Sequence, residues 1–405
     1  MKFSLVNLGC KVNRVEADSI GAALLAAGWE AVERDADVAI LNTCTVTAEA
    51  DRKTRKEVNR AVVHNPGAPV LVTGCAAAID PDAYLALSEN VHIVEKNNVV
   101  DECFALAGQA YEHASALLRV GDAFPTRVGV KVQDGCDNAC TYCIVHVARG
   151  KATSVPLQQV IDEVSAYAQS GVHEVVLTGI DLGAYRYETT GLSGLIRALR
   201  SAAPETRLRI SSIEPVTLDD ELIELLVQEE GMVCRHLHIP LQSGSTKVLH
   251  DMARRYTAED YVQLISKLRA AVPELSLSTD VIVGFPGETE EDFEATMDVA
   301  RACAFSRMHI FRYSKREGTP AAQRDDQVVP ELKADRMERL HSLAAELRSA
   351  DAQKRLGTTE LVLVESKGRG MSESYYEVHM PLEAQRGALL PVCLQTFEED
   401  GFFSL

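Results

Sequence analysis

Long apolar runs are absent from this chain of 405 residues, and aromatic residues make up only 5% of it. No run reaches the roughly 20 apolar residues that a membrane-spanning helix requires. The first ten residues read as a buried strand, because they lack the longer apolar core and the small-residue cleavage site of a signal peptide. We therefore expect a cytoplasmic protein that does not contact the membrane.

Basic residues are in deficit as well. The formal net charge is −18, which argues against a general nucleic-acid binder but leaves room for a local basic path. Hydrophobic residues make up 46% and charged residues 25% of the chain, which are ordinary values for a globular protein. A chain of this length is expected to form two or three domains.

Ten cysteines are present, and in a reducing cytoplasm they are better interpreted as metal ligands or core residues than as disulfides. Three of them, Cys136, Cys140 and Cys143, follow the spacing C-x3-C-x2-C. This spacing can place three thiolates around one iron–sulfur cluster and leave one iron without a protein ligand. A zinc site with His146 as a fourth ligand is the alternative, although zinc sites usually carry C-x2-C pairs.

A second group of cysteines follows a topological pattern. Cys10, Cys44 and Cys75 each come just after an expected strand. These strands are expected at residues 2–8, 38–42 and 69–73. In an open α/β sheet, ligands gather at the carboxyl ends of the strands, so the pattern predicts a second three-thiolate cluster with an open iron. The alternative is that these three are buried core residues. We interpret the remaining four cysteines, Cys103, Cys234, Cys303 and Cys393, as core residues.

Strand and helix patterns alternate along most of the chain, which indicates an α/β protein. In the first third they predict an open parallel α/β domain. A second series predicts a partial (βα)6 barrel of the TIM type. Its strands are expected at residues 128–132, 174–178, 207–211, 236–240, 276–283 and 307–311. A long charged helix at residues 331–355 follows, and the alternation after it predicts a small β-barrel. The expected domains are residues 1–115, 122–355 and 356–405.

The cysteine run, with Tyr142 directly before its last cysteine and a place after the first barrel strand, resembles the radical S-adenosylmethionine (SAM) superfamily. In that superfamily the open iron binds SAM, and an electron from the cluster cleaves SAM to a 5′-deoxyadenosyl radical. The resemblance implies SAM contacts at the ends of three further strands. The turn after the second strand would meet the SAM amino group, and the glycine turn after the fifth would let the backbone approach the adenine. The carboxylate after the third strand is a polar contact or, equally, an ordinary loop residue. The implied contacts are Tyr142, Thr178, Gly179, Asp181, Glu214, Gly284 and Gly287.

Motifs along nearly the whole chain make the resemblance narrower. They lie at residues 7–16, 42–51, 148–150, 238–245 and 279–289. Together with the cysteine run they look like the methylthiotransferases, which are radical SAM enzymes with an N-terminal auxiliary-cluster domain and a C-terminal RNA-binding TRAM barrel. Residues 11–13 and 43–51 resemble the branch of this family that acts on N6-threonylcarbamoyladenosine in tRNA.

The resemblance implies two 4Fe–4S clusters, two SAM molecules per turnover, and addition of a methylthio group to C2 of that nucleoside at A37, beside the anticodon. Isopentenyladenosine in tRNA and ribosomal protein S12 stay open as other family substrates. A non-catalytic iron–sulfur or zinc protein that binds RNA stays open as a different class. The expected partners are tRNA, a sulfur donor and a low-potential electron donor resembling flavodoxin or ferredoxin, and the protein is expected to be a monomer.

Candidate RNA contacts are few. Phosphate contacts are electrostatic, and stacking on a base requires an aromatic ring. The candidates are Arg52, Lys53, Arg55 and Lys56 on one expected helix, Arg254 and Arg255 beside the barrel, and Tyr375 and Tyr376 in the tail. A solvated helix face is an equally common role for such charge runs. From residue 357 on, eight acidic residues outnumber three basic ones, which is unfavourable for a sequence-independent grip on RNA.

Overall fold

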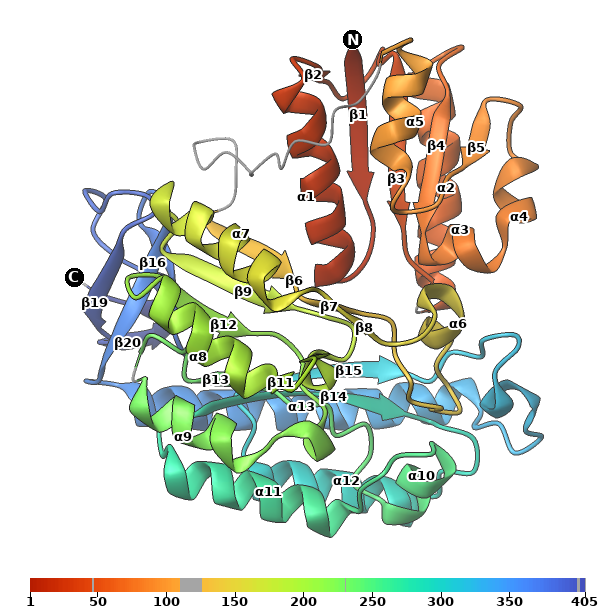
Figure 1. Ribbon diagram of the computed structural model, residues 1–405. Coiled ribbons are helices and arrows are strands. Elements are labelled where there is room, and N and C mark those ends of the chain that lie inside the picture. Colours follow the sequence, from red (N-terminus) through yellow and green to blue (C-terminus); the bar gives the residue numbers. More distant parts are fainter. Residues whose placement is uncertain (46, 110–125, 230, 399–400, 405) are drawn as a thin grey trace.

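Residues 1–45, 47–109, 126–229, 231–398 and 401–404 are described here from a computed structural model of the chain (Figure 1). The connector between the first two expected domains lies almost entirely outside these residues, and so do Glu399 and Asp400 of the acidic tail. Within the described ranges, no helix is both long and apolar enough to cross a membrane.

The N-terminal part is an open sheet with helices on both faces, as the sequence pattern predicted. Its strand order is β2-β1-β3-β4-β5, and every pairing is parallel. All residues of the central strand β3 are buried, because such a strand has apolar contacts on both faces. The strands are β1 (Lys2–Asn7), β2 (Glu30–Ala31), β3 (Val38–Thr43), β4 (Val70–Gly74) and β5 (Val91–Ile93).

Helices α1 (Lys11–Ala26) and α5 (Val99–Leu106) pack on one face of this sheet and α2 (Ala48–His64) packs on the other. The apolar pattern predicts a helix at residues 15–27, and α1 begins four residues before that range. The reason is local, since Gly9 has a φ of +128° and turns the chain sharply after β1, so that Cys10 becomes the N-cap. Two short helices after β4 were not expected, α3 (Cys75–Ile79) and α4 (Pro81–Leu85).

The central part is a parallel half-barrel. Strands pair in the orders β12-β9-β6 and β13-β14-β15, and two isolated parallel bridges, Leu208–Val233 and Ser212–His238, join the two sheets. The strands are β6 (Arg127–Lys131), β9 (Glu174–Thr178), β12 (Arg207–Ile210), β13 (His236–His238), β14 (Ser276–Val283) and β15 (Arg307–Arg312). All six match expected strands, and their ends differ from the expected ones by at most two residues.

Five helices of the half-barrel match closely the helices that the sequence pattern predicts at residues 157–169, 192–202, 219–228, 258–271 and 290–301. They are α7 (Leu157–Gln169), α8 (Leu192–Ala202), α9 (Asp220–Gln228), α11 (Ala258–Ala271) and α12 (Glu290–Cys303). These helices cover the outer face of the strands (Figure 1), and their apolar side chains form one large core with the strands. Helix α13 (Pro330–Arg355) packs against β15 and leads to the C-terminal part.

The C-terminal part is a six-stranded, mostly antiparallel sheet of order β19-β16-β17-β18-β21-β20. Its strands are β16 (Thr359–Ser366), β17 (Arg369–Ser372), β18 (Glu377–His379), β19 (Leu389–Cys393), β20 (Thr396–Glu398) and β21 (Gly401–Phe403). Among the residues described, no pairing joins the outer strands β19 and β20, so closure into a barrel stays a prediction.

This sheet is docked on the amino-terminal ends of the half-barrel strands. Arg209 donates hydrogen bonds to the carbonyls of Ser372 and Glu373 at 2.9 and 3.1 Å, and Arg207 donates to the Met371 carbonyl at 3.3 Å. Both guanidiniums are buried and pair with Glu174. The acidic tail is therefore held against the half-barrel by buried, charge-assisted contacts.

Candidate functional site

Cys10, Cys44 and Cys75 lie at the carboxyl edge of the N-terminal sheet, where their sequence positions placed them. Cys44 directly follows β3, Cys75 directly follows β4, and Cys10 comes three residues after β1. These three strands are neighbours and parallel, so their ends meet at one edge. A Cβ on Gly9 would lie 2.8 Å from Cys44 Cβ, which shows how closely the turn before Cys10 approaches Cys44.

A buried pair of asparagines braces this edge. Asn13 Nδ2 donates to Asn42 Oδ1 and to the Thr43 carbonyl, both at 2.9 Å, and Asn42 Nδ2 donates back to the Asn13 carbonyl at 2.8 Å. The Cys10 thiol donates to Asn13 Oδ1 at 3.2 Å. The asparagines are 0% and 1% exposed, so these bonds act in a low-dielectric interior and fix the two turns relative to each other.

The second cysteine group occupies the loop between β7 (Gln133–Asp134) and α6 (Val145–Arg149). Each of its three sulfurs accepts one hydrogen bond: Cys136 from the Asn138 N–H at 3.4 Å, Cys140 from Arg254 Nη1 at 3.3 Å, and Cys143 from the Val145 N–H at 3.4 Å. Donors to sulfur are the contacts by which proteins tune iron–sulfur clusters. The loop therefore offers three sulfurs with their supporting donors already in place.

Several of these thiols have raised pKa values. Burial raises the pKa of Cys143 to about 11 and also raises the pKa of Cys136 and Cys75, with neighbouring N–H donors opposing it in each case. A nucleophilic cysteine needs the opposite shift, because the thiolate is its reactive form. A coordinated metal deprotonates a thiol outright, so these sulfurs fit metal ligation better than free nucleophilic chemistry.

The zinc alternative with His146 finds no preformed ligand group among the described residues. In the part of the chain that the structure describes, no three side chains of His, Cys, Asp or Glu stand close enough to hold one metal ion. The zinc alternative with His146 requires such a group. In a 4Fe–4S cluster each thiolate binds a different iron, so the sulfurs stand apart.

Arg149 connects the two cysteine groups. Its side chain is 2% exposed and comes from α6, just after the second group. Nε donates to Cys75 Sγ at 3.2 Å, and Nη2 donates to Asn13 Oδ1 at 3.0 Å. Nη1 pairs with both Glu16 and Asp134 at 2.9 Å. The sequence marked Arg149 only as part of a motif and gave no sign that it reaches the other cysteine group.

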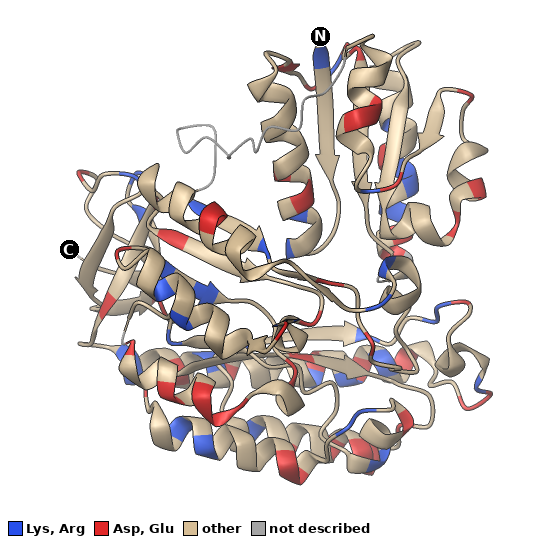
Figure 2. Ribbon diagram, viewed as in Figure 1, with Lys and Arg blue, Asp and Glu red and all other residues tan. Residues whose placement is uncertain are grey.

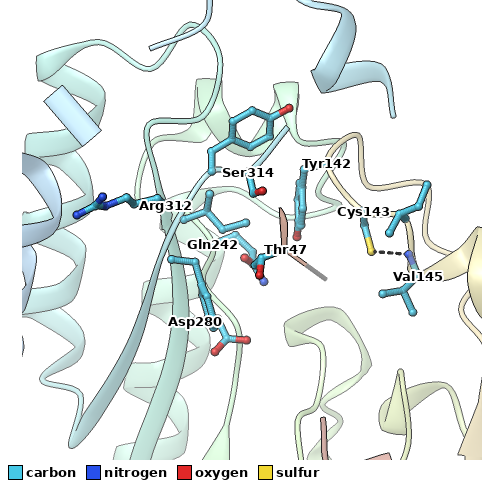
Figure 3. Close-up of a pocket in the computed structure, with 12 residues that line it drawn as sticks. Thr47, Tyr142, Cys143, Val145, Gln242, Asp280, Arg312 and Ser314 are labelled. Atoms are coloured by element: carbon cyan, nitrogen blue, oxygen red, sulfur yellow. Dashed lines mark hydrogen bonds between the residues drawn. The ribbon is translucent and has the colours of Figure 1, made fainter. Parts of the chain in front are cut away.

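A cavity of about 180 Å³ opens beside Cys143 (Figure 3). Thr47 lines it from the N-terminal part, Tyr142 from the cysteine loop, and Gln242 and Asp280 from the half-barrel. Thr47 comes only three residues after Cys44. The cavity is thus bounded by Cys143 of one cysteine group and by the loop that carries Cys44 of the other.

Arg316 fastens the N-terminal part over this cavity. It follows β15 and the cavity residue Ser314. Nη1 pairs with Asp51 of α2 at 2.6 Å, and Nη2 donates to the Thr45 hydroxyl. Arg316 was not among the residues that the sequence singled out, because its partners are more than 260 positions away along the chain.

Asp181 and Glu214, two of the expected SAM contacts, do lie beside the cysteine loop. Asp181 Oδ2 accepts from Asn138 Nδ2 at 2.9 Å, and the Asp181 N–H donates to Gln133 Oε1 at 2.8 Å. Asp181 Oδ1 is buried and has no hydrogen-bond partner among the described atoms. Thr178 and Gly179 form the turn that leads to it. This orphaned acceptor suits a donor group of a bound ligand.

The two expected SAM glycines have another role in the structure. Gly284 and Gly287 have φ values of +71° and +76°, which explains the residue type. A Cβ on Gly284 would lie 2.3 Å from Lys333 Cγ, and one on Gly287 would lie 2.5 Å from side-chain atoms of Arg324 and Asp326. Side chains of the protein itself occupy the space on the Cβ side of these glycines, and the approach of adenine to their backbone stays a prediction.

Two expected RNA contacts are wrong. The Arg254 side chain is 4% exposed, pairs with Glu214 and donates to Cys140 Sγ, so it belongs to the cysteine loop. Tyr376 is 0% exposed in the core of the C-terminal sheet and cannot stack on a base. Tyr375 is half-buried beneath basic side chains.

The remaining basic candidates are exposed. Arg52, Lys53, Arg55 and Lys56 lie on α2, where Figure 2 shows basic residues in blue, and Arg255 is exposed beside the half-barrel. Arg55 forms a loose ion pair with Asp80 at 3.6 Å, half-exposed on both sides. These residues stay candidates for phosphate contacts.

Comparison with known proteins decides the family. A family model described as the Radical SAM superfamily matches residues 130–300, and one described as Uncharacterized protein family UPF0004 matches residues 2–95. The threonylcarbamoyladenosine tRNA methylthiotransferase MtaB of Bacillus subtilis is 39% identical to the chain, over 84% of this chain and 79% of that protein. The chain belongs to the methylthiotransferase family of radical SAM enzymes. A 4Fe–4S cluster and SAM are implied by this membership.

A second relative carries a different substrate in its name. The tRNA-2-methylthio-N(6)-dimethylallyladenosine synthase of Zymomonas mobilis is 34% identical, over 91% of this chain and 86% of that protein. Among solved structures, the radical SAM methyltransferase TsrM of Kitasatospora setae superposes with a TM-score of 0.59 at 18% identity, over 79% of this chain and 77% of that chain. That likeness concerns the fold alone.

Proposed function

We propose that the chain is a tRNA methylthiotransferase that adds a methylthio group to C2 of N6-threonylcarbamoyladenosine at A37, the position 3′ to the anticodon. The observation that carries this proposal is the placement of two groups of three cysteines on adjoining loops, bridged by Arg149. A radical generator alone needs one such group, whereas methylthiolation also needs a place that holds sulfur. The name and the 39% identity of the Bacillus subtilis relative support the choice of nucleoside.

The proposed ligands are Cys136, Cys140 and Cys143 for one 4Fe–4S cluster, and Cys10, Cys44 and Cys75 for an auxiliary one. When bound, the clusters and two molecules of SAM supply the electron, the radical, the methyl group and the sulfur that this chemistry needs. The chain is suited to bind the first cluster, because N–H donors already form hydrogen bonds with the sulfurs of Cys136, Cys140 and Cys143. The buried Asp181 Oδ1 suits the amino group of SAM.

The remaining task of the chain is to position the base. An adenine C2–H has no acidic proton, so the reaction asks for no general base, and orientation and exclusion of water become the protein's contribution. The cavity beside Cys143 meets this need, since Thr47 and Tyr142 enclose it from two separate parts of the chain. The proposed domains, residues 1–115, 122–355 and 356–405, would give each cysteine group its own domain.

The proposed tRNA contacts are the exposed cations of α2 together with Arg255. Helix α2 begins four residues after Cys44, so a stem held along α2 would lie next to the cavity. The C-terminal sheet is proposed as a TRAM-like barrel. Because it is acidic, it contributes less phosphate binding than is expected of an RNA-binding TRAM barrel.

Mass spectrometry of nucleosides from a strain that lacks the gene tests the proposal. We expect the methylthio form of N6-threonylcarbamoyladenosine to disappear and the unmodified nucleoside to accumulate. A plasmid carrying the gene should restore it, and the same plasmid carrying Cys136→Ala should not. Loss of the methylthio form of dimethylallyladenosine instead would move the assignment to the substrate in the name of the Zymomonas mobilis relative. An unchanged nucleoside profile together with an altered mass of protein S12 would show that the substrate is ribosomal protein S12.

A further inference from the structure

A lysine beside the N-terminal cysteines has no acidic partner. Lys11 directly follows Cys10 and begins α1. Its ammonium lies 5.3 Å from the centre of the Tyr375 ring, and within the described ranges it forms no ion pair. It lines a cavity of about 310 Å³ that is also bordered by Arg127, Arg209 and Tyr375. Lys11 is exposed at this cavity, so its ammonium is accessible to an anionic ligand, with which it can form charge-assisted hydrogen bonds.

The surroundings of Lys11 are basic. Arg209 Cζ lies 4.9 Å and Arg127 Cζ lies 5.6 Å from the centre of the same phenol ring, and the His236 ring is 4.8 Å away. Arg209 pairs with Glu174, which it shares with Arg207, and Arg127 pairs with Glu365. These pairs leave the positive charge of Lys11 in excess.

Arg307 adds to this excess. It begins β15, is exposed, and is close enough to Lys11 to act on its ammonium electrostatically. As with Lys11, no carboxylate pairs with Arg307 in the parts of the chain described here. Arg14, a further cation of the cavity lining, is paired with Asp18 at 2.8 Å. Among the described residues, Lys11 is therefore the lining cation without a carboxylate partner, and Arg307 lies outside the lining.

The backbone at Tyr375 is a separate sign of a built site. Tyr375 has a φ of +70°, which is uncommon for a bulky residue, and such conformations cluster at functional sites. It belongs to the turn between β17 and β18, which Arg209 holds by hydrogen bonds to Ser372 and Glu373. The C-terminal sheet thus inserts one phenol among the basic groups beside α1.

The volume and charge of this cavity define its ligand. About 300 Å³ is the lower end of ordinary ligand pockets, so the space takes a substituent rather than a whole nucleotide. Carboxylates form short, strong hydrogen bonds with ammonium and guanidinium groups. A phosphate of the RNA backbone is also negatively charged. The two anions can be told apart because the carboxylate belongs to the modified base and the phosphate does not.

We propose that Lys11, with Arg307 and Tyr375, binds the carboxylate of an amino-acid substituent on the adenine and so selects a substrate that carries one. This inference rests on the proposed function and adds the group that recognises the substrate. An apolar dimethylallyl substituent offers nothing to a lysine in this cavity and would leave the charge unpaired.

The test compares two anticodon stem-loop RNAs with the reconstituted enzyme. One carries threonylcarbamoyl at A37, and the other carries its methyl ester, which removes only the carboxylate charge. We expect the wild-type kcat/KM for methylthio incorporation to be about tenfold to a hundredfold higher with the acid than with the ester. Lys11→Met should lower the rate with the acid by a similar factor and leave the ester unchanged. Lys11→Arg should retain most of the preference.

Iron content and 5′-deoxyadenosine formation are measured on every variant, because Lys11 is next to a proposed ligand. Arg307→Gln, which is remote in sequence from every cysteine, should reduce the preference without loss of iron. Lys267→Met, an exposed residue paired with Asp220 on an outer helix, is the matched control and should keep it.

Three outcomes would overturn the inference. Equal rates of the wild-type enzyme with acid and ester would exclude carboxylate recognition. An equal loss with both RNAs in Lys11→Met would indicate a contact with the RNA phosphates. A full preference in both Lys11→Met and Arg307→Gln would exclude these cations. If the wild-type enzyme modifies neither RNA, the proposed function itself fails, which is a different result.

Discussion

Arg149 Nε donates a hydrogen bond of 3.2 Å to Cys75 Sγ, although Arg149 lies six residues after Cys143 in the other cysteine group. The same guanidinium pairs with Glu16 and Asp134. Arg149 therefore links the loops of the two groups and also places a charged donor against one sulfur. Hydrogen bonds to sulfur and nearby charge are the terms by which a protein sets the reduction potential of an iron–sulfur cluster.

Replacing Arg149 should change the auxiliary cluster more than the SAM-binding one. In Arg149→Gln we expect the auxiliary cluster to have a lower reduction potential, because a positive charge beside its sulfur ligand is lost. SAM cleavage should persist, whereas methylthio transfer should fall by at least tenfold. Redox titration followed by electron paramagnetic resonance, in a chain that also carries Cys136→Ala, Cys140→Ala and Cys143→Ala, reports the auxiliary cluster alone.

Arg149→Lys is the matched variant, since it keeps the charge and loses the fork that reaches several acceptors at once. It should retain more of the potential than Arg149→Gln. If neither variant moves the potential while both lose transfer activity, Arg149 acts only by holding the loops together.

Single cysteine replacements should separate the two clusters. Cys136→Ala should lose about four of the seven to eight irons per chain and all 5′-deoxyadenosine formation. Cys75→Ala should lose the same number of irons and still form 5′-deoxyadenosine, without any methylthio product. Cys393→Ala is the control, because Cys393 is distant in sequence from both groups and is exposed, not in the core as its sequence context indicated. Formation of 5′-deoxyadenosine by Cys136→Ala would contradict the proposed ligation.

The positions of the cysteines could be predicted from the sequence because they depend on topology alone. Cys10, Cys44 and Cys75 follow three strands, and the ends of parallel strands lie at one edge whatever the details of packing. The spacing of the second group is local, so it too could be read directly. The two glycines after β14 could be recognised as turn residues, but the neighbours that fill their space come from later in the chain.

The errors concern side chains whose surroundings are set by distant residues. Arg254 and Arg255 look alike in the sequence, yet Arg254 is buried against Glu214, 40 positions earlier. Tyr375 and Tyr376 are consecutive, and one of two consecutive residues usually faces the core. The alternation does not say which, and only the packing around Phe402 shows that Tyr376 is inside.

The contact between Arg316 and Asp51 should couple the N-terminal part to the half-barrel. Asp51 is 28% exposed and Arg316 is 11% exposed, so the pair is partly screened and we expect a coupling energy of about 1 kcal/mol. A double-mutant cycle with Arg316→Ala and Asp51→Ala, read out by denaturant unfolding, measures it. The single variants should also lower methylthio transfer, because Thr47 at the cavity would be held less firmly. A coupling energy of zero would remove Arg316 as a positioning residue.

Glu174 should be a principal support of the C-terminal sheet. It is fully buried between Arg207 and Arg209, and these arginines donate to carbonyls of the sheet. Burial raises the pKa of Glu174, but the two guanidiniums outweigh burial and hold it at about 2, below the ordinary value of about 4.3. Because the folded-state pKa is depressed, the stabilisation is present above about pH 4.3 and is lost as the pH falls toward 2.

Glu174→Gln should therefore lower the free energy of unfolding at pH 7 by about 3–5 kcal/mol, since it leaves two buried guanidiniums without a counterion. The variant should also lose the part of the acid-side pH dependence that falls between about pH 4.3 and 2, because the titrating carboxyl is gone. Urea unfolding at pH 7 measures the first effect, and urea unfolding across the acidic range measures the second. Glu221→Gln is the control: it removes an exposed pair with Arg197 and should change stability by less than about 1 kcal/mol. An equal effect of the two variants would mean that the buried cluster does not hold the sheet in place.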